Sequence, residues 1–337
     1  MVSKAVASPV EDTRASRKIS PTVVTVATIY GLVVVMILAS RLISPSFGGL
    51  SQFETILYLS SFLVFCAFGQ GLVILVRGLD LSIASVITVG GVLSASLMDG
   101  GNDGLLFVIP TILLLCALIG AVNGIGVTLF NVPPFIMTMS VGIIVYSLSL
   151  GFTGGTPRGF PAPALNGFMQ SRFLGIPWPI YLLLGFAALG TVLQSFSSYG
   201  RKLTAVGNNP EAAYVAGLAR RRLITSAYVI SAVCAGLTGI LLASYANGAT
   251  LRMGDDYLLP TIAAVVVGGS SILGGRGTFL GTVGGALLLT TLATILSALG
   301  IGQGWKTVMS GFVILLALIL LRDQVFDGLR AMLVRKD

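Results

Sequence analysis

Apolar stretches long enough to cross a lipid bilayer recur along this chain, the first of them from Pro21 to Ile43. A helix needs about 20 apolar residues to cross a hydrocarbon layer of about 30 Å. Of the 337 residues, 55% are hydrophobic and 9% are charged, and the mean hydropathy is +0.97. Soluble domains carry about 25% charged residues. The sequence therefore predicts an all-α integral membrane protein that lies in a lipid bilayer.

Ten transmembrane helices are expected. The first is retained, because it is longer than the apolar core of a signal peptide and lacks a clean small-residue cleavage site. The third and the eighth are short and rich in Gly and Ser. The expected spans are 21–43, 55–77, 81–98, 104–130, 134–153, 176–194, 222–246, 258–273, 278–300 and 305–322.

The basic residues indicate the orientation, because Lys and Arg collect in cytoplasmic loops. With both chain ends inside, the tails 1–20 and 323–337 and a polar loop at about 195–222 are cytoplasmic, and 21–322 forms the transmembrane domain. The net charge of +8 then reflects topology, and no basic stripe with interleaved aromatic residues suggests nucleic acid. Of the 20 Lys and Arg residues, those left outside are Arg41, Arg158, Arg172, Arg252 and Lys306.

An internal repeat relates the two halves of the chain. Residues 87–91 (ITVGG) parallel 265–269 (VVVGG), and residues 119–124 (IGAVNG) parallel 280–285 (LGTVGG). The matching spans are five apart, an odd number, so the two halves would be inverted in the membrane. Inverted repeats are typical of transporters, whose substrate path lies at the interface of the repeats.

Several chemistries are excluded by what the sequence lacks. Histidine is absent, which removes the commonest proton shuttle and metal ligand, and no metal site, catalytic residue or cofactor is expected. Residues 269–276 imitate a P-loop, but Gly275 and Arg276 stand where its Lys and Ser/Thr belong, so no ATP site is predicted. Three cysteines lie in separate apolar runs and are expected to be small buried hydrophobic residues: Cys66, Cys116 and Cys234.

The loop after the sixth span contains signals for a short helix at about 210–219. Asn209 is a good N-cap, Pro210 suits the first helical position, and Glu211 complements the helix dipole. Three arginines, 220–222, follow at the level of the lipid headgroups. The segment is either an interfacial helix with topogenic arginines or a projection that another cytoplasmic protein grips.

The same segment carries a resemblance to a known family. Glu211-Ala212-Ala213 followed by Gly217 resembles the EAA motif of ABC importer permeases, the coupling helix that docks on an ATPase subunit. Its context is similar to the ribose-type (monosaccharide) permeases. Three further segments, in the right order, resemble elements of that family, and together the four cover most of 55–325. They are 77–82 (RGLDLS, where Arg77 replaces a glycine), 123–138 (NG followed by VPPFIMT) and 262–278 (IAAVVVGG through GGRGT).

The resemblance implies a permease of the bacterial inner membrane that translocates a pentose or hexose by alternating access. It implies as partners a cytoplasmic ABC ATPase, an extracytoplasmic sugar-binding protein and a second, usually identical, permease chain. The expected ATPase-coupling residues are Asn209, Pro210, Glu211, Ala212, Ala213, Gly217 and Arg220. The expected substrate-path residues are Asp80, Ser82, Asn123, Phe135, Thr138, Ser270 and Ser271. Three arginines on the outside, Arg158, Arg172 and Arg252, are candidates for docking the binding protein.

Several of these residues also have simpler interpretations. Asp80 could satisfy backbone amides at a helix start, and Asn123 could form a hydrogen bond between helices. Residues 133–134 (PP) suit a helix break and restart. Trp178 and Trp305, near span ends, are typical of interface anchors.

Three other functions stay open on the sequence alone. The first is a permease of the branched-chain amino-acid group, which shares a related architecture. The second is a self-sufficient secondary transporter or channel, which leaves the Glu-Ala-Ala loop unexplained. The third is an intramembrane enzyme, for which no Ser/His pair, His cluster or paired carboxylates exist.

Overall fold

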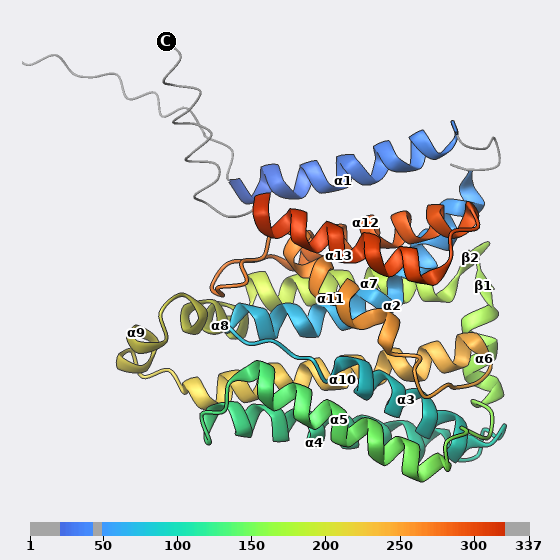
Figure 1. The fold of residues 1–337 in the computed structure, drawn as a ribbon, viewed down its shortest axis with the longest axis horizontal. Helices are drawn as coiled ribbons and strands as arrows, with labels where there is room; N and C mark the ends of the chain where they lie inside the picture. The colour runs from blue at the N-terminus through green and yellow to red at the C-terminus, as the bar shows by residue number, and fades with distance from the viewer. Residues whose placement is uncertain (1–20, 43–48, 321–337) are drawn as a thin grey trace, which may run out of the picture.

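The computed structural model describes residues 21–42 and 49–320, which form an elongated bundle of helices aligned along one direction (Figure 1). The predicted tails 1–20 and 323–337 and the last residues of the first and tenth predicted spans lie outside the described residues. The elements are, in chain order, α1 (Pro21–Ser40), α2 (Leu50–Leu75), α3 (Ile83–Met98), α4 (Leu105–Thr128), α5 (Pro134–Thr153), α6 (Pro163–Gln170), β1 (Arg172–Phe173), β2 (Ile176–Pro177), α7 (Trp178–Thr191), the π-helix η1 (Val192–Phe196), α8 (Ser198–Asn208), α9 (Pro210–Val215), α10 (Arg220–Ala246), α11 (Asp255–Val267), α12 (Phe279–Ala298) and α13 (Gln303–Leu320).

Within the described residues, 7 helices are long and apolar enough to cross a membrane: α1, α2, α4, α5, α7 with η1, α10 and α12. They coincide with seven of the ten predicted spans. The third, eighth and tenth predicted spans coincide with α3, α11 and α13, which have 16, 13 and 18 residues.

The third and eighth predicted spans are only partly helical. The third was predicted from residue 81, but its helix begins at Ile83, after a non-helical segment at 76–82. The eighth was predicted to end at residue 273, but its helix ends at Val267, because the chain turns at Gly268 and at Gly269, whose φ is +86°. Each short helix is therefore joined to a non-helical stretch.

Two helices form the centre of the bundle. Within an apolar stretch of 18 residues, 83% of the residues are buried in α2 and 67% in α10, whereas only 17% are buried in α1 and in α4. The two central helices can approach closely because Gly69 has no side chain. A side-chain carbon at this position would collide with the Cα atom of Ser231. The outer helices turn large apolar side chains outward, among them Leu114 of α4 and Ile143 of α5, as contact with lipid requires.

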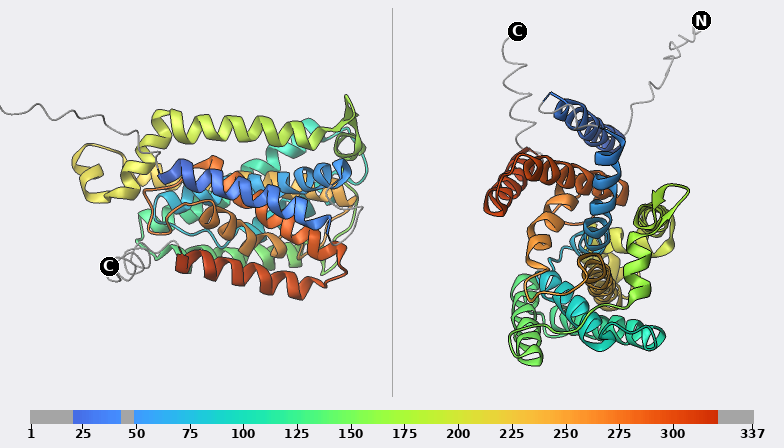
Figure 2. Two further views of the ribbon diagram at one scale, coloured as in Figure 1. Left: turned by 90° about the horizontal axis from the view of Figure 1, so that it is seen from above. Right: turned by 90° about the vertical axis from the view of Figure 1, so that its right-hand side faces the viewer.

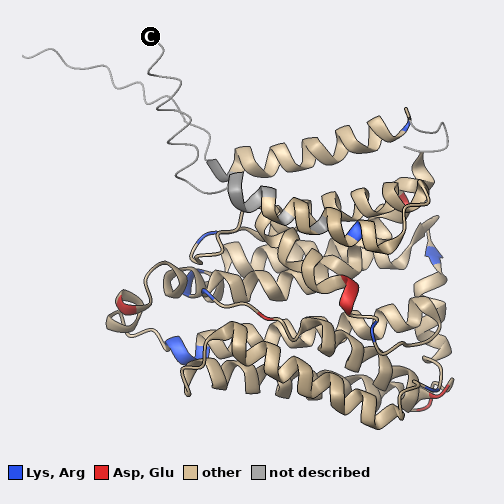
Figure 3. Cartoon of the chain, viewed as in Figure 1, with Lys and Arg blue, Asp and Glu red and all other residues tan. Residues whose placement is uncertain are grey.

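Charged residues lie mostly at the two ends of the helices (Figure 3). The short helices α8 and α9 project from one end, beyond the other helices (Figure 2). The helix α6 and the hairpin of β1 and β2 lie at the opposite end (Figure 1). The hairpin turn uses positive φ angles at Leu174 and Gly175, which suits a two-residue antiparallel connection.

Candidate functional site

The helix α9 is held at its start by its own cap. The Asn209 Oδ1 atom accepts hydrogen bonds from the backbone N–H of Glu211 at 3.1 Å and of Ala212 at 3.0 Å. Pro210 is the first helical residue, where its missing N–H costs nothing. The predicted cap and start of this helix are confirmed.

The predicted end of this helix is wrong. It was expected to reach about residue 219, but it ends at Val215, because Gly217 adopts a φ of +76°. The N–H of Leu218 then donates to the carbonyl of Ala213 at 3.0 Å, a Schellman-type C-terminal cap. Gly217 is thus a helix terminator, and no atom of the described residues lies within 4 Å of the place where its side-chain carbon would stand.

The short helix presents an apolar surface to solvent. Ala213 is 5% exposed and packs inward, whereas Tyr214 and Val215 are 74% and 86% exposed. The arginines 220–222 that follow are exposed at the first turn of α10, where a positive charge opposes the helix dipole. Exposed apolar side chains beside three exposed arginines favour contact with another molecule at this end.

Four predicted path residues lie in one buried polar cluster. The Asp80 Oδ1 atom accepts from the N–H of Ser82 at 3.0 Å and from its hydroxyl at 2.6 Å, and Oδ2 accepts from the Ser231 hydroxyl of α10 at 2.9 Å. Asn123 of α4 donates to the Ser82 hydroxyl at 2.9 Å. The Thr138 hydroxyl of α5 accepts from the N–H of Leu81 at 3.0 Å.

This cluster ties the non-helical segment 76–82 to three helices. Asp80, Ser82, Asn123, Thr138 and Ser231 are all 0% exposed. The simpler interpretations are confirmed here, because Asp80 accepts from a backbone amide at the start of α3 and Asn123 bonds to a residue outside its own helix. Ser231 was missed, since a single serine in an apolar span gives no signal of its partner.

The other predicted path residues lie elsewhere. Phe135 of α5 is 52% exposed. Ser270 and Ser271 belong to the turn after α11, where the N–H of Ser271 donates to the carbonyl of Arg276 at 2.8 Å. The predicted break at 133–134 is confirmed, with Pro134 as the first residue of α5.

A glutamine in the middle of α2 was also missed. Gln70 is 0% exposed, and neither its amide nitrogen nor its amide oxygen has a hydrogen-bond partner in the described part of the chain. The Oδ1 atom of Asn123 is buried and likewise has no hydrogen-bond partner among the described residues, although its amide nitrogen is bonded to Ser82. Buried polar groups are nearly always paired, so these two amides are candidates to contact a polar solute. A lone glutamine in an apolar helix was the available signal.

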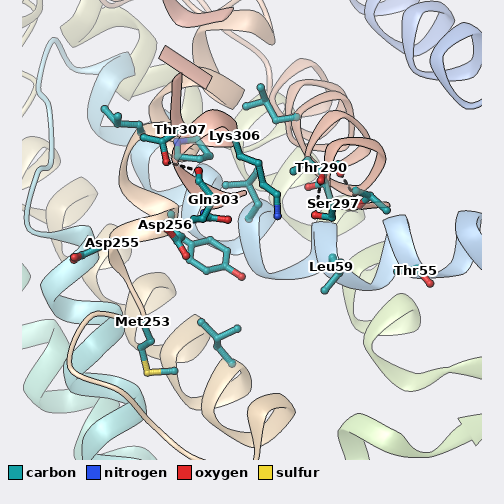
Figure 4. Close-up of a pocket in the computed structure, with 18 of the residues that line it drawn as sticks. Thr55, Leu59, Met253, Asp255, Asp256, Thr290, Ser297, Gln303, Lys306 and Thr307 are labelled. Atoms are coloured by element: carbon teal, nitrogen blue, oxygen red, sulfur yellow. Dashed lines mark hydrogen bonds between the residues drawn. The ribbon is translucent and has the colours of Figure 1, made fainter. Parts of the chain in front are cut away.

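A cavity of about 710 Å³ lies between α2, α11, α12 and α13. Figure 4 shows side chains from several elements around it, including Asp256, Ser297, Gln303 and Lys306. Its polar lining consists mainly of hydroxyl and amide groups, with an acidic pair at the start of α11 and a single lysine. These groups can form hydrogen bonds with a small polar solute. None of the predicted path residues lines it; the lining residues with polar side-chain groups are Thr55, Asp255, Asp256, Tyr257, Thr290, Thr294, Ser297, Gln303, Lys306 and Thr307.

Two of the three outer arginines are paired within the chain. Arg172 lies 3.0 Å from the carboxylate of Glu54, and Arg252 lies 2.7 Å from that of Asp255. The hydrogen bond to Asp255 raises the pKa of Arg252 above its ordinary value. Arg158 is exposed near the same end of the bundle.

Comparison with known proteins identifies the family. The family described as "Branched-chain amino acid transport system / permease component" matches residues 52–318. The chain belongs to this family. Its relatives include the ribose import permease protein RbsC of Bacillus subtilis (strain 168), 33% identical over 297 residues, which are 87% of this chain and 91% of the relative.

Two further relatives are similar over nearly their whole length. RbsC of Escherichia coli (strain K12) is 32% identical, with 87% of this chain and 92% of the relative covered. The galactose/methyl galactoside import permease protein MglC of Haemophilus influenzae is 31% identical, with 81% and 87% covered. No solved structure matches the chain. The chain is accordingly a transport permease and a multi-pass protein of the bacterial inner membrane.

Proposed function

We propose that this chain is the membrane subunit of an ABC importer that carries a monosaccharide, is driven by a separate ATPase and is supplied by an external sugar-binding protein. The observation that carries the proposal is α9, a capped helix that projects from the bundle with exposed apolar residues, in a family whose relatives are named as ribose and galactose import permeases. Residues 209–213, Gly217 and Arg220 form the proposed ATPase-docking element.

The chemistry of the interior supports a neutral cargo. The cavity lining, the amide of Gln70 and the Oδ1 atom of Asn123 offer hydroxyl and amide groups, which match the hydroxyl groups of a sugar. We propose that the sugar path includes this cavity, Gln70 and the buried cluster at Asp80, together with the remaining predicted residues Phe135, Ser270 and Ser271.

A branched-chain amino acid is the second candidate cargo. The description of the matching family names it, and Asp256 and Lys306 in the cavity would suit the two charges of a zwitterion. Uptake by cells that express this chain with its partners separates the two. The proposal expects labelled ribose or galactose to accumulate without competition from excess leucine, and uptake of leucine alone would contradict it.

The proposed architecture is ten spans in two inverted halves. The helix α10 of the second half packs against α3 and α4 of the first, α2 of the first half packs against α11 and α12 of the second, and α2 contacts α10. A twofold axis in the membrane plane predicts such reciprocal contacts. The start of α1 and the end of α13 lie at the end of the bundle that carries α8 and α9 (Figure 1), which supports a cytoplasmic location for both chain ends. Two such chains, identical or related, would form the complete pore.

The docking element is tested by Gly217→Trp. A side-chain carbon at position 217 would meet no atom of the described chain within 4 Å, but only glycine readily adopts the positive φ of this position, so the replacement disturbs the end of α9 and adds bulk on the docking face. The spans should insert normally, because the loop lies outside the bilayer, and sugar uptake should be lost. Pull-down of the ATPase separates failed docking from failed coupling. A variant that inserts, docks and transports at the normal rate would disprove the assignment.

A further inference from the structure

Arg77 joins the projecting helices to the transmembrane bundle. It lies in the segment 76–82, two residues beyond the end of α2. Its Nε atom donates to the carbonyl of Gly207 at 2.6 Å, and its Nη2 atom donates to the carbonyl of Asn208 at 2.7 Å. These are the last two residues of α8, directly before the cap of α9. A planar guanidinium suits two acceptors held side by side.

The backbone around this contact is closely packed. A side-chain carbon on Gly207 would collide with the carbonyl oxygen of Leu75, at the end of α2. The same carbonyl accepts from the N–H of Gly275 at 2.9 Å. The ends of α2 and α8 and the loop after α11 therefore meet at one junction, with Arg77 across it.

Arg77 occupies a strained conformation to make this contact. Its φ is +65°, in the left-handed region that non-glycine residues rarely adopt. In the sequence element that this segment resembles, a glycine stands at this position, and glycine adopts such angles without strain. The arginine is held there by its two charge-assisted hydrogen bonds.

Three residues further on, Asp80 continues the connection. Its carboxylate binds Ser82 before α3 and Ser231 of α10, and Asn123 of α4 binds Ser82. Hydrogen bonds thus hold the segment 77–82 at both ends, through Arg77 to the end of α8 and through Asp80 and Ser82 to α10 and α4, and the backbone of 77–80 joins the two sets.

We propose that Arg77 is a coupling residue, which transmits movement of α8 and α9 to the segment 77–82 and through Asp80 to the start of α3, the last turns of α4 and the middle of α10. The proposal rests on the proposed function, in which an ATPase docks on α9. Arg77 acts by positioning and touches neither sugar nor nucleotide. It makes the segment next to Asp80 move with the docking element as one unit.

The test compares Arg77→Gly, Arg77→Ala and Arg77→Lys in the assembled transporter. Glycine removes both hydrogen bonds and relieves the strain, so Arg77→Gly should fold even if Arg77→Ala does not. Loss of a hydrogen bond to a charged group changes an equilibrium by about tenfold or more. We therefore expect sugar imported per ATP hydrolysed to fall about tenfold in Arg77→Gly, with the melting temperature retained, and Arg77→Lys, which keeps a donor, to recover part of the loss.

The matched control is Arg201→Ala. Arg201 also lies in α8 and binds a backbone carbonyl, that of Phe196 at 2.8 Å, but this carbonyl is at the end of η1, the element directly before α8 in the chain, and the contact does not reach the segment 77–82. Its ratio of sugar to ATP should match the unaltered chain. If Arg77→Gly keeps the normal ratio, or loses only melting temperature, Arg77 is a helix cap and the proposal is wrong.

A second measurement does not depend on the cargo. Hydrogen exchange of amides 77–82 should change when the purified ATPase docks on the unaltered chain, and should not change in Arg77→Gly. Equal changes in both proteins would overturn the coupling role. An unaltered assembly that moves no sugar would refute the proposed function, while the exchange result would still decide the role of Arg77.

Discussion

Gln70 gives a prediction in which stability and transport move in opposite directions. Its side chain is fully buried in α2, and its amide nitrogen and oxygen lack partners in the described chain. An unpaired buried polar group costs about 1–3 kcal/mol. Methionine has a similar unbranched shape and no amide. We expect Gln70→Met to raise the free energy of unfolding by about 2 kcal/mol, because two unpaired groups are removed and some gain is lost to imperfect packing.

The same substitution should impair transport. If the amide contacts sugar hydroxyls as the cargo passes, its loss removes about 1 kcal/mol of interaction, or roughly fivefold in uptake rate. Stability and activity often trade against each other at functional sites. A buried amide with no role in transport would give the stability gain without the loss of uptake.

Thermal unfolding can be followed with a thiol-reactive dye, because Cys66, Cys116 and Cys234 are free and buried, as predicted. A gain of about 2 kcal/mol corresponds to a rise of roughly 4 °C in Tm. The matched control is Gln194→Met. Gln194 is also buried but donates to the carbonyl of Gly277 at 3.3 Å, so this variant should lose about 1 kcal/mol. A lower Tm for Gln70→Met would refute the reasoning, since it would mean that the amide is satisfied in the membrane.

Three further predictions concern the docking element, the buried cluster and the outer arginines. Asn209→Ala removes the cap of α9, worth about 1 kcal/mol, and should weaken ATPase binding up to about fivefold by titration, whereas Asn209→Asp keeps a capping oxygen and should bind normally. Asn123→Leu should reduce sugar uptake and lower Tm, because the hydrogen bond to Ser82 is lost; unchanged uptake would remove Asn123 from the path. Charge reversal at Arg158, Arg172 and Arg252 together should reduce uptake driven by the binding protein, while single reversals should change little, because exposed ion pairs are weak; normal uptake in the triple variant would end the docking proposal.

Local signals in the sequence were sufficient to predict much of the docking element. The cap at Asn209 and the start of α9 depend on neighbouring residues, so they were readable without the fold. The end of α9 was not, because Gly217 was interpreted as a residue inside the helix. A glycine shortly after a helix start fits either interpretation, and only the backbone angle decides between them.

Contacts between distant segments could not be predicted from the sequence. Asp80 and Asn123 were recognised as unusual polar residues, but Ser231, which binds Asp80 from 151 positions away, carries no signal of its own. The cavity has the same origin, since its lining comes from α2 and from α11 to α13. Arg77 stood out only as a departure from a glycine in the resembling motif, and its hydrogen bonds to the end of α8 required the fold.

The most direct test of the central claim is sugar transport in proteoliposomes of defined composition. The purified chain would be reconstituted alone, with its ATPase, and with both the ATPase and the sugar-loaded binding protein. We predict that the chain alone neither binds nor hydrolyses ATP and moves no sugar, because its glycine-rich turn at 269–276 lacks the Lys and Ser/Thr of a P-loop. Only the complete assembly should accumulate labelled ribose or galactose, and only when ATP is present on the side of the membrane where the ATPase lies. Saturable sugar uptake by the chain alone, or specific ATP binding to it, would contradict the account.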